Sequence, residues 1–152
     1  MKTNYQRTAD WLHRCGKGQT VQNTSVQIGC DFEEQAEFLQ CLDLDDGDMK
    51  LINDRVRFVA SELNYLGNLL KRGLITARIP KGRRAEAIDA LCDREVTGNG
   101  IAFLADMDKD GADRAVLDSN DDKLVDGVPV ILEGGKIGKR PGWQAPDLTP
   151  FV

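Results

Sequence analysis

Three closely spaced glutamates are the residues of this sequence best suited to chemistry. Glu33, Glu34 and Glu37 form an EExxE motif. At about 100° per residue in a helix, they lie within an arc of about 100° on one side. Carboxylates held this close repel one another unless they are solvated or share a cation. The motif therefore predicts either an ordinary acidic helix face or one half of a metal site.

A second set of carboxylates lies further along the chain. Glu86, Asp89 and Asp93 are spaced i, i+3, i+7, which places them within about 60° of one another on a helix. Two antiparallel helices that offer such carboxylates inward form an all-oxygen cage of the kind that Mg²⁺ and Mn²⁺ prefer. The two sets together predict a divalent metal site, with Mg²⁺ as the cofactor and Mn²⁺ as the alternative.

Polar and aromatic residues outside these sets have types suited to a nucleotide. Asn120 offers hydrogen-bond donors, and Lys123 is a compact charge that suits a phosphate. The alternative is that Asn120 caps the C-terminus of a helix. Trp11 and Trp143 are the best candidates for stacking on a base, although core packing explains either residue equally well. Six bases between Lys71 and Arg84, with no acid among them, either steer a polyphosphate or form a solvated linker.

A calcium loop is the competing metal motif. The segment 106–111 reads DMDKDG, which matches the first half of an EF-hand loop. Such a loop needs a bidentate Glu at its twelfth position, and that position here is Leu117, which cannot ligate. The sequence therefore favours a polar turn whose aspartates cap the following helix.

Composition excludes several classes of protein. The chain has 152 residues and a formal net charge of −5, so a general nucleic-acid binder with a basic face is not expected. Four cysteines without a close pair and a single histidine argue against zinc. The polar N-terminus and the lack of an apolar run of about 20 residues predict neither a signal peptide nor a membrane partner. We expect a cytoplasmic protein with free thiols.

The periodicity of apolar residues predicts an all-α fold, a helical bundle of about five helices with an irregular or short β C-terminal arm. The helices are expected over residues 3–15, 25–42, 48–73, 83–105 and 112–119, with Ser25 and Asp48 as N-caps and Gly73 as a C-terminal glycine. The whole chain, 1–152, is expected to be one domain, with the arm over 121–152. The long third helix carries an apolar stripe that needs a partner, in cis or in trans.

The order of these motifs resembles that of the MazG-like all-α nucleoside triphosphate pyrophosphohydrolases. The resemblance rests on EExxE at 33–37, ExxD at 86–89, Ser119-Asn120 with Lys123, and arm segments such as 126–130 and 142–147. It covers roughly residues 25–43 and 83–150. Three features depart from the family pattern: the gap between the carboxylate motifs is longer than usual, Arg94 and Glu95 occupy positions that are usually apolar, and the second motif can be aligned on either Asp89 or Asp93.

The resemblance implies a metal-dependent enzyme that cleaves a nucleoside triphosphate between the α and β phosphates, giving a monophosphate and pyrophosphate. The roles that it implies are a base at Glu33, metal ligands at Glu34, Glu37, Glu86 and Asp89 or Asp93, and substrate binding by Asn120, Lys123 and Trp11. It also implies a homo-oligomer, a dimer or tetramer.

A rival interpretation is non-enzymatic. Residues 30–49 hold eight acids and no Lys or Arg, which is typical of a solvated acidic face. An acidic helical interaction module, either an adaptor or a charge mimic, would use such a face to bind a basic partner.

Overall fold

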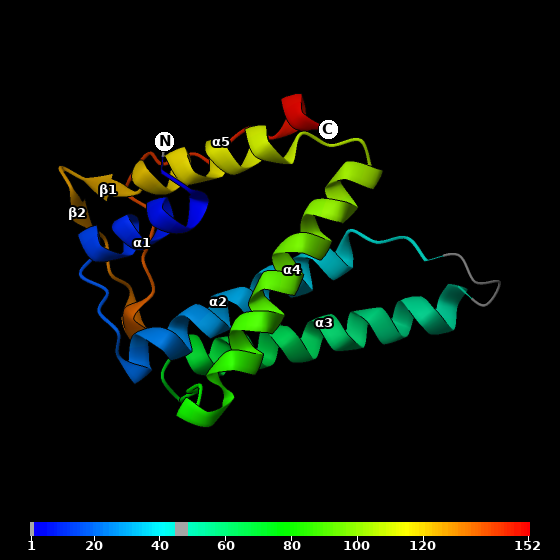
Figure 1. Cartoon of the computed structure of the whole chain (residues 1–152), viewed down its shortest axis with the longest axis horizontal. Helices are drawn as coiled ribbons and strands as arrows, with labels where there is room; N and C mark the ends of the chain where they lie inside the picture. The colour runs from blue at the N-terminus through cyan, green and yellow to red at the C-terminus, as the bar shows by residue number, and fades with distance from the viewer. Residues whose placement is uncertain (1, 45–48) are drawn as a thin grey trace. The chain divides into compact units, whose positions relative to one another are not determined.

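Five α-helices dominate the structure, a computed structural model that describes residues 2–44 and 49–152. Within these ranges the elements are α1 (Asn4–Arg14), α2 (Val21–Gln40), α3 (Met49–Lys71), α4 (Arg84–Leu104), α5 (Lys109–Asp121), β1 (Leu124–Val125) and β2 (Val128–Pro129) (Figure 1). Short 3₁₀ helices span Lys81–Arg83 (η1), Glu133–Gly135 (η2) and Thr149–Phe151 (η3). The predicted all-α class with a short β arm is confirmed.

The chain divides into two compact units. The hairpin unit consists of Gln19–Arg78 and Leu132–Lys136, and the α1–α5 unit consists of Met1–Gly18, Ile79–Ile131 and Ile137–Val152. The prediction of a single domain over residues 1–152 stays a prediction. In the described residues, no helix combines the length and apolar character that a membrane span needs.

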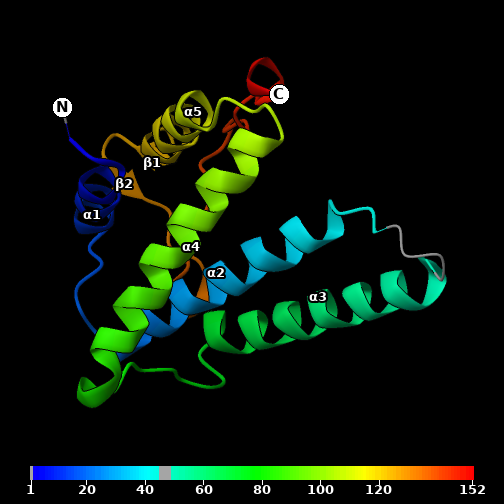
Figure 2. The ribbon, with the colours of Figure 1, turned by 45° about the vertical axis from the view of Figure 1, so that its right-hand side comes forward.

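In the hairpin unit, α2 and α3 lie side by side and antiparallel (Figures 1 and 2). They approach most closely at Gly29 and Gly67, where a Cβ added to either glycine would lie 2.7 Å from the carbonyl oxygen of the other. Ser25, Ala36 and Ala60 are also buried along this seam. Small residues let the two backbones approach closely, and the larger side chains of Val26 and Leu70 are also buried on these two helices.

The predicted start of α2 at Ser25 is wrong. The helix begins at Val21, and the hydroxyl of Thr20 caps it by accepting the N–H of Asn23 (3.1 Å). Ser25 is fully buried inside the helix, where its hydroxyl accepts the N–H of Ala77 (2.8 Å). Both Thr20 and Ser25 are residue types that cap helices, but the Ser25 hydroxyl bonds the segment that follows α3 and so cannot cap its own helix.

The C-terminal end of α3 follows the prediction. Gly73 has a left-handed φ of +70°, and its N–H donates to the carbonyl of Leu70 (3.1 Å). The next N–H, from Leu74, donates to Leu69 (2.9 Å), which is the pattern of a Schellman ending. The predicted N-cap, Asp48, lies outside the described residues.

In the α1–α5 unit, α5 is longer than the predicted 112–119. It begins at Lys109, because the Asp108 carboxylate accepts the N–H of Gly111 (2.9 Å) and caps the helix one turn earlier. The C-terminal Phe151 packs on this turn: a Cβ added to Gly111 would lie 2.5 Å from the Phe151 ring. Asp108 thus caps α5, in line with the expected polar turn.

Helix α4 presents a largely exposed surface. Its side chains at Ile88, Val96 and Phe103 are 58%, 69% and 81% exposed, and Ala102 is its buried residue. A Cβ added to Gly98 would meet no described atom within 4 Å. The apolar content of this helix is therefore mostly uncovered in the single chain.

Candidate functional site

The three α2 glutamates differ in their surroundings. Glu34 and Glu37 are exposed, whereas Glu33 is partly buried, with 28% of its side chain accessible. The carboxylate of Glu33 binds two lysines, Lys71 Nζ at 2.7 Å on one oxygen and Lys136 Nζ at 2.9 Å on the other. The EExxE motif thus combines one partly buried carboxylate, held by two lysines, with two carboxylates that are more exposed.

The second lysine comes from the loop Leu132–Lys136, which we call the clasp. Gly134 has a φ of +79°, and a Cβ there would collide with the backbone carbonyl of Lys71, so only glycine fits this position without strain. The side chain of Gln22 donates to the Gly134 carbonyl (3.3 Å). The clasp is therefore seated against the ends of α2 and α3 through its backbone, and Lys136 extends from it to Glu33.

The ion pairs set the protonation state of Glu33. Partial burial acts to raise the pKa of Glu33, but the hydrogen bonds from Lys71 and Lys136 outweigh it and hold this pKa below its ordinary value. For Lys136, burial acts to lower the pKa, and the hydrogen bond with Glu33 outweighs it, so the pKa of Lys136 is raised. Both groups are charged at neutral pH, and a carboxylate with a lowered pKa is a weaker base than a free one.

The second carboxylate set lies on the N-terminal half of α4. Glu86, Asp89 and Asp93 are all exposed, and Glu86 forms an ion pair with Arg83 Nε at 2.5 Å. Their oxygen-only chemistry suits Mg²⁺ or Mn²⁺. Because they lie on one helix at helical spacing, they share a face of α4, as the sequence predicts.

The two carboxylate sets belong to different units. In the described parts of the chain, no group of three His, Cys, Asp or Glu side chains is arranged to hold a metal ion. The cage that would draw on both sets therefore stays a prediction, as do the roles of Glu34, Glu37, Glu86, Asp89 and Asp93 as ligands.

The predicted substrate-binding residues come together in the α1–α5 unit. The indole N–H of Trp11, on α1, donates to the backbone carbonyl of Asn120 at the end of α5 (2.8 Å). Lys123 Nζ donates to the side-chain oxygen of Asn120 (2.7 Å) and lies 5.9 Å from the centre of the Trp11 ring. Trp11, which is distant in sequence from Asn120 and Lys123, thus forms one cluster with them. Because Lys123 is held by an amide and lies near an aromatic ring, it also stabilises the contact between α1 and the end of α5.

Trp143 extends this cluster from the C-terminal arm. Its indole N–H donates to the carbonyl of Ser119 (3.0 Å), while Lys123 and Lys139 lie 5.4 and 4.4 Å from its ring centre. These are cation–π distances. The cluster therefore joins α1, the end of α5 and the arm around Lys123.

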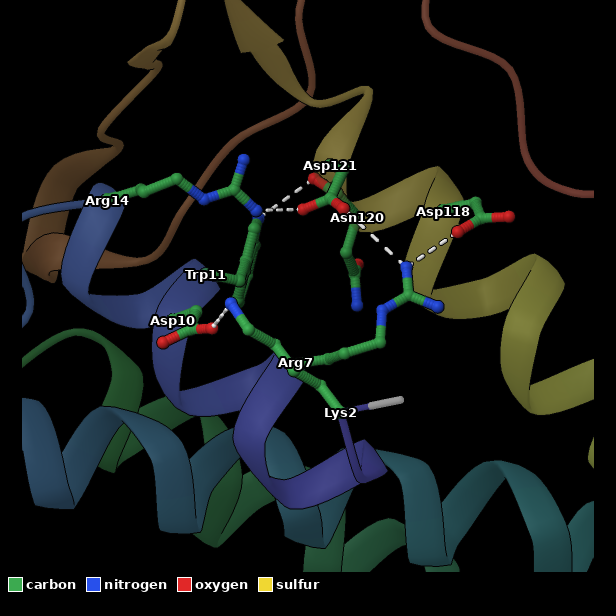
Figure 3. Close-up of polar contacts among 8 residues, drawn as sticks. All are labelled: Lys2, Arg7, Asp10, Trp11, Arg14, Asp118, Asn120 and Asp121. Atoms are coloured by element: carbon green, nitrogen blue, oxygen red, sulfur yellow. Dashed lines mark hydrogen bonds and ion pairs between the residues drawn. The ribbon is translucent and has the colours of Figure 1, made fainter.

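Ion pairs between α1 and α5 surround the cluster (Figure 3). Arg7 binds Asp118 at 2.6 Å and Asp121 at 3.6 Å, and Arg14 also binds Asp121. A cavity of about 10 Å³ lies here, lined by Arg7, Thr8, Trp11, Leu117, Asn120 and Asp121. It has room for a single water molecule, so a nucleobase would need the side chains to move.

A larger groove of about 610 Å³ lies in the hairpin unit. Its lining combines apolar side chains with amide, hydroxyl and guanidinium groups: Leu39, Gln40, Leu42, Asn53, Val56, Arg57, Ala60, Ser61 and Asn64. It follows the seam between α2 and α3, beyond the EExxE motif toward the end of α2. The sequence analysis did not single out these residues.

Comparisons with protein-family models, with curated proteins and with solved structures gave no match. The resemblance to the MazG-like enzymes therefore rests on the motifs of this chain alone.

The sequence analysis also missed Lys71 and Lys136 as individual partners of Glu33. Lys71 is buried in the hairpin unit. A lysine at the end of the apolar stripe of α3 could have indicated that an acidic partner was needed. Lys136 follows Gly134-Gly135, a pair typical of a sharp turn, but nothing in the sequence indicated which helix the turn would reach.

Proposed function

We propose that this protein is a metal-dependent nucleoside triphosphate pyrophosphohydrolase, which cleaves the α–β phosphoanhydride to give a monophosphate and pyrophosphate. The observation that carries the proposal is the ordered pair of carboxylate motifs on α2 and α4, each with exposed oxygens on one helix face. Support also comes from the resemblance in motif order to the MazG-like family. The substrate class is a ribo- or deoxyribonucleoside triphosphate.

In this proposal the carboxylates of both helices hold Mg²⁺, or Mn²⁺ in its place. The ligands are Glu34, Glu37, Glu86 and Asp89 or Asp93. Bound Mg²⁺ would neutralise charge that develops on the phosphates and lower the pKa of a bound water. Glu33 is the proposed base, a role that the motif resemblance implies; its pairing with Lys71 keeps it ionised, and its lowered pKa makes it a weaker base than a free carboxylate.

The substrate is proposed to bind through the cluster of Trp11, Asn120 and Lys123. Lys123 supplies a cation for phosphate oxygens, and the Asn120 side chain, which now accepts from Lys123, is able to donate through its amide. Trp11 offers a ring for stacking, with its N–H already bonded to a backbone carbonyl. These roles follow from residue chemistry and from their proximity in the α1–α5 unit.

The direct test is product analysis. The protein is incubated with a panel of ribo- and deoxyribonucleoside triphosphates in Mg²⁺ or Mn²⁺, and the products are separated by ion-exchange chromatography. We expect a monophosphate and pyrophosphate, with the activity abolished by chelator and reduced at least about 100-fold by Glu37→Gln. Glu62→Gln, a change at an exposed glutamate of α3, is the matched control and should leave the rate unchanged.

The second candidate function is an acidic interaction module that binds a basic partner. The observation that favours it is the exposure of Glu34 and Glu37, which lie in the acid-rich segment 30–49, since an exposed surface of one charge attracts a partner of the opposite charge. A protein that only mimics charge, however, would not need carboxylate motifs at defined spacing on two helices, which is why the enzyme is the first proposal. Failure to turn over any nucleotide, together with no divalent metal bound in calorimetry, would favour this module and refute the enzyme.

We also propose that the protein is a cytoplasmic homo-oligomer, a dimer or tetramer. Large apolar side chains on α3 support association, because Phe58 and Tyr65 are 66% and 59% exposed in the single chain. Light scattering coupled to size-exclusion chromatography tests this proposal: a mass of two or four chains is expected, and a monomer at high concentration would contradict it.

A further inference from the structure

We infer that Lys136 binds the polyphosphate of the substrate and so completes the α2 half of the site. This inference rests on the proposed function, because it names a further ligand of the same substrate. It concerns the clasp, a segment to which the motif resemblance assigns no binding role.

The Glu33 carboxylate is shared between two cations. It binds Lys71 and Lys136, and Glu34 also lies within electrostatic reach of Lys136. A structural ion pair needs only one lysine. The second lysine therefore has charge to offer to an anion that arrives beside Glu34 and Glu37.

The two lysines are not equivalent. The side chain of Lys71 is 9% exposed, and it depends on Glu33 because a buried ammonium without a partner is costly. The side chain of Lys136 is 38% exposed. Lys136 can therefore exchange its carboxylate for a phosphate oxygen, while Lys71 keeps Glu33 ionised and in place.

The backbone of the clasp presents Lys136 in a defined position. Antiparallel pairing of Ile131 with Ile137 closes the base of the loop, and within it the Leu132 N–H donates to the Lys136 carbonyl (2.8 Å). Gly134 lies against the Lys71 carbonyl where no side chain fits. Because the loop is ordered before a ligand binds, little backbone entropy is lost when Lys136 engages one.

The chemistry of the position favours a polyphosphate over other anions. A nucleoside triphosphate carries about four negative charges, and its metal-bound form still needs cations for its remaining oxygens. A lysine ammonium is a compact donor of three charge-assisted hydrogen bonds. Glu34 and Glu37 would repel a free anion at this point, but they would attract one that brings a divalent cation.

The test compares Lys136 with an exposed basic residue elsewhere in the hairpin unit. We propose to measure the affinity for a non-hydrolysable α,β-methylene deoxynucleoside triphosphate with Mg²⁺ by calorimetry, together with KM and kcat on the hydrolysable triphosphate. Loss of one charged hydrogen bond predicts that Lys136→Met weakens binding about 10–100-fold and raises KM by a similar factor. Lys136→Arg should recover part of the affinity, since it keeps the charge. Arg55→Met, at an exposed basic residue of α3, should stay within about twofold of wild type.

A second variant separates binding from support of the loop. Gln22→Ala removes the hydrogen bond to the Gly134 carbonyl but keeps Lys136. Binding that is retained in Gln22→Ala and lost in Lys136→Met supports the inference. Equal loss in both variants, or wild-type affinity in Lys136→Met, overturns it.

Failure of the proposed function gives a different result. If the wild-type protein turns over no triphosphate and does not bind the methylene analogue, the enzyme proposal falls, and this inference falls with it. If the wild-type protein is active and Lys136→Met has unchanged KM and affinity, the inference alone falls and the enzyme proposal stands.

Discussion

Replacement of Glu33 by glutamine tests the account of the α2 site most directly. The substitution keeps the size of the side chain but removes the charge that compensates Lys71. If Glu33 were only an exposed member of an acidic face, like Glu37, the change would barely affect the stability of the fold. Because Glu33 pairs with a lysine that is 9% exposed, we expect a clear loss instead.

The size of the loss follows from the burial of the two partners. Breaking a fully buried ion pair costs about 3–5 kcal/mol. Here the Glu33 side chain is 28% accessible, and the amide oxygen of the introduced glutamine still accepts a hydrogen bond, so both solvent screening and the remaining bond reduce the cost. We expect Glu33→Gln to lower the free energy of unfolding by about 1–3 kcal/mol, against less than about 0.5 kcal/mol for Glu37→Gln.

Urea denaturation followed by far-UV circular dichroism measures this difference, and its pH dependence provides a second check. The pKa of Glu33 lies below its ordinary value of 4.5 in the folded protein. The pair therefore contributes fully above about pH 4.5 and loses its contribution as the pH falls through the folded pKa. The gap between wild type and Glu33→Gln should be constant from about pH 6 to 8 and should shrink at acidic pH.

Two outcomes would refute this reasoning. Equal stability of Glu33→Gln and Glu37→Gln at neutral pH would show that Lys71 does not depend on Glu33. A gap that widens toward acidic pH would contradict the sign of the linkage. The double variant Glu33→Gln with Lys71→Met removes both charges, and we expect it to be more stable than Glu33→Gln alone.

Three further predictions concern the helix contacts. Gly29→Ala should destabilise the protein by about 1–3 kcal/mol more than Gly98→Ala, because both changes gain helix propensity but only Gly29→Ala brings a Cβ to 2.7 Å from a backbone oxygen. Chemical denaturation of the two variants measures the difference in stability, and equal values would contradict the close approach of α2 and α3. Ser25→Ala should lower the stability of the fold by about 1–3 kcal/mol, because the Ala77 N–H loses its acceptor. The control, Thr24→Ala, should change stability by less than about 1 kcal/mol. Similar melting curves for the two variants would argue against the buried hydrogen bond between Ser25 and Ala77. Trp143→Phe should cost about 1 kcal/mol through loss of the indole bond to the Ser119 carbonyl, measured by thermal melting, and an unchanged melting temperature would show that the arm is not held there.

The helices themselves were largely predictable because their signals are local. The apolar spacing and Gly73, which adopts a left-handed φ, determine where α3 ends, and both the spacing and the glycine can be recognised in the sequence. The start of α2 was not predictable in this way. Thr20 and Ser25 have the same capping chemistry, and only the distant contact of Ser25 with Ala77 decides which of them caps the helix.

The candidate site shows the same division between local and distant signals. Residue chemistry singled out Asn120 together with Lys123, and separately Trp11, and the structure joins Trp11 to Asn120 through a hydrogen bond across 109 residues of sequence. Lys136 lacked such a signal. Its bond to Glu33 spans 103 residues and depends on a tight turn at Gly134, so neither composition nor spacing could locate its partner.

Among the three glutamates of the EExxE motif, Glu33 is the one whose substitution gives the most ambiguous result in an activity assay. In the sequence the three glutamates are equivalent in type, yet the fold partly buries Glu33 between two lysines, whereas Glu34 and Glu37 are more exposed. Loss of activity in Glu33→Gln has two causes that assay rates alone do not separate, a missing base and an uncompensated Lys71. Loss of activity in Glu37→Gln has no such structural cause, because that side chain is exposed. The metal-ligand role of the motif is therefore decided at Glu37, and the role of Glu33 as a base is decided only by rates measured on protein shown to be folded.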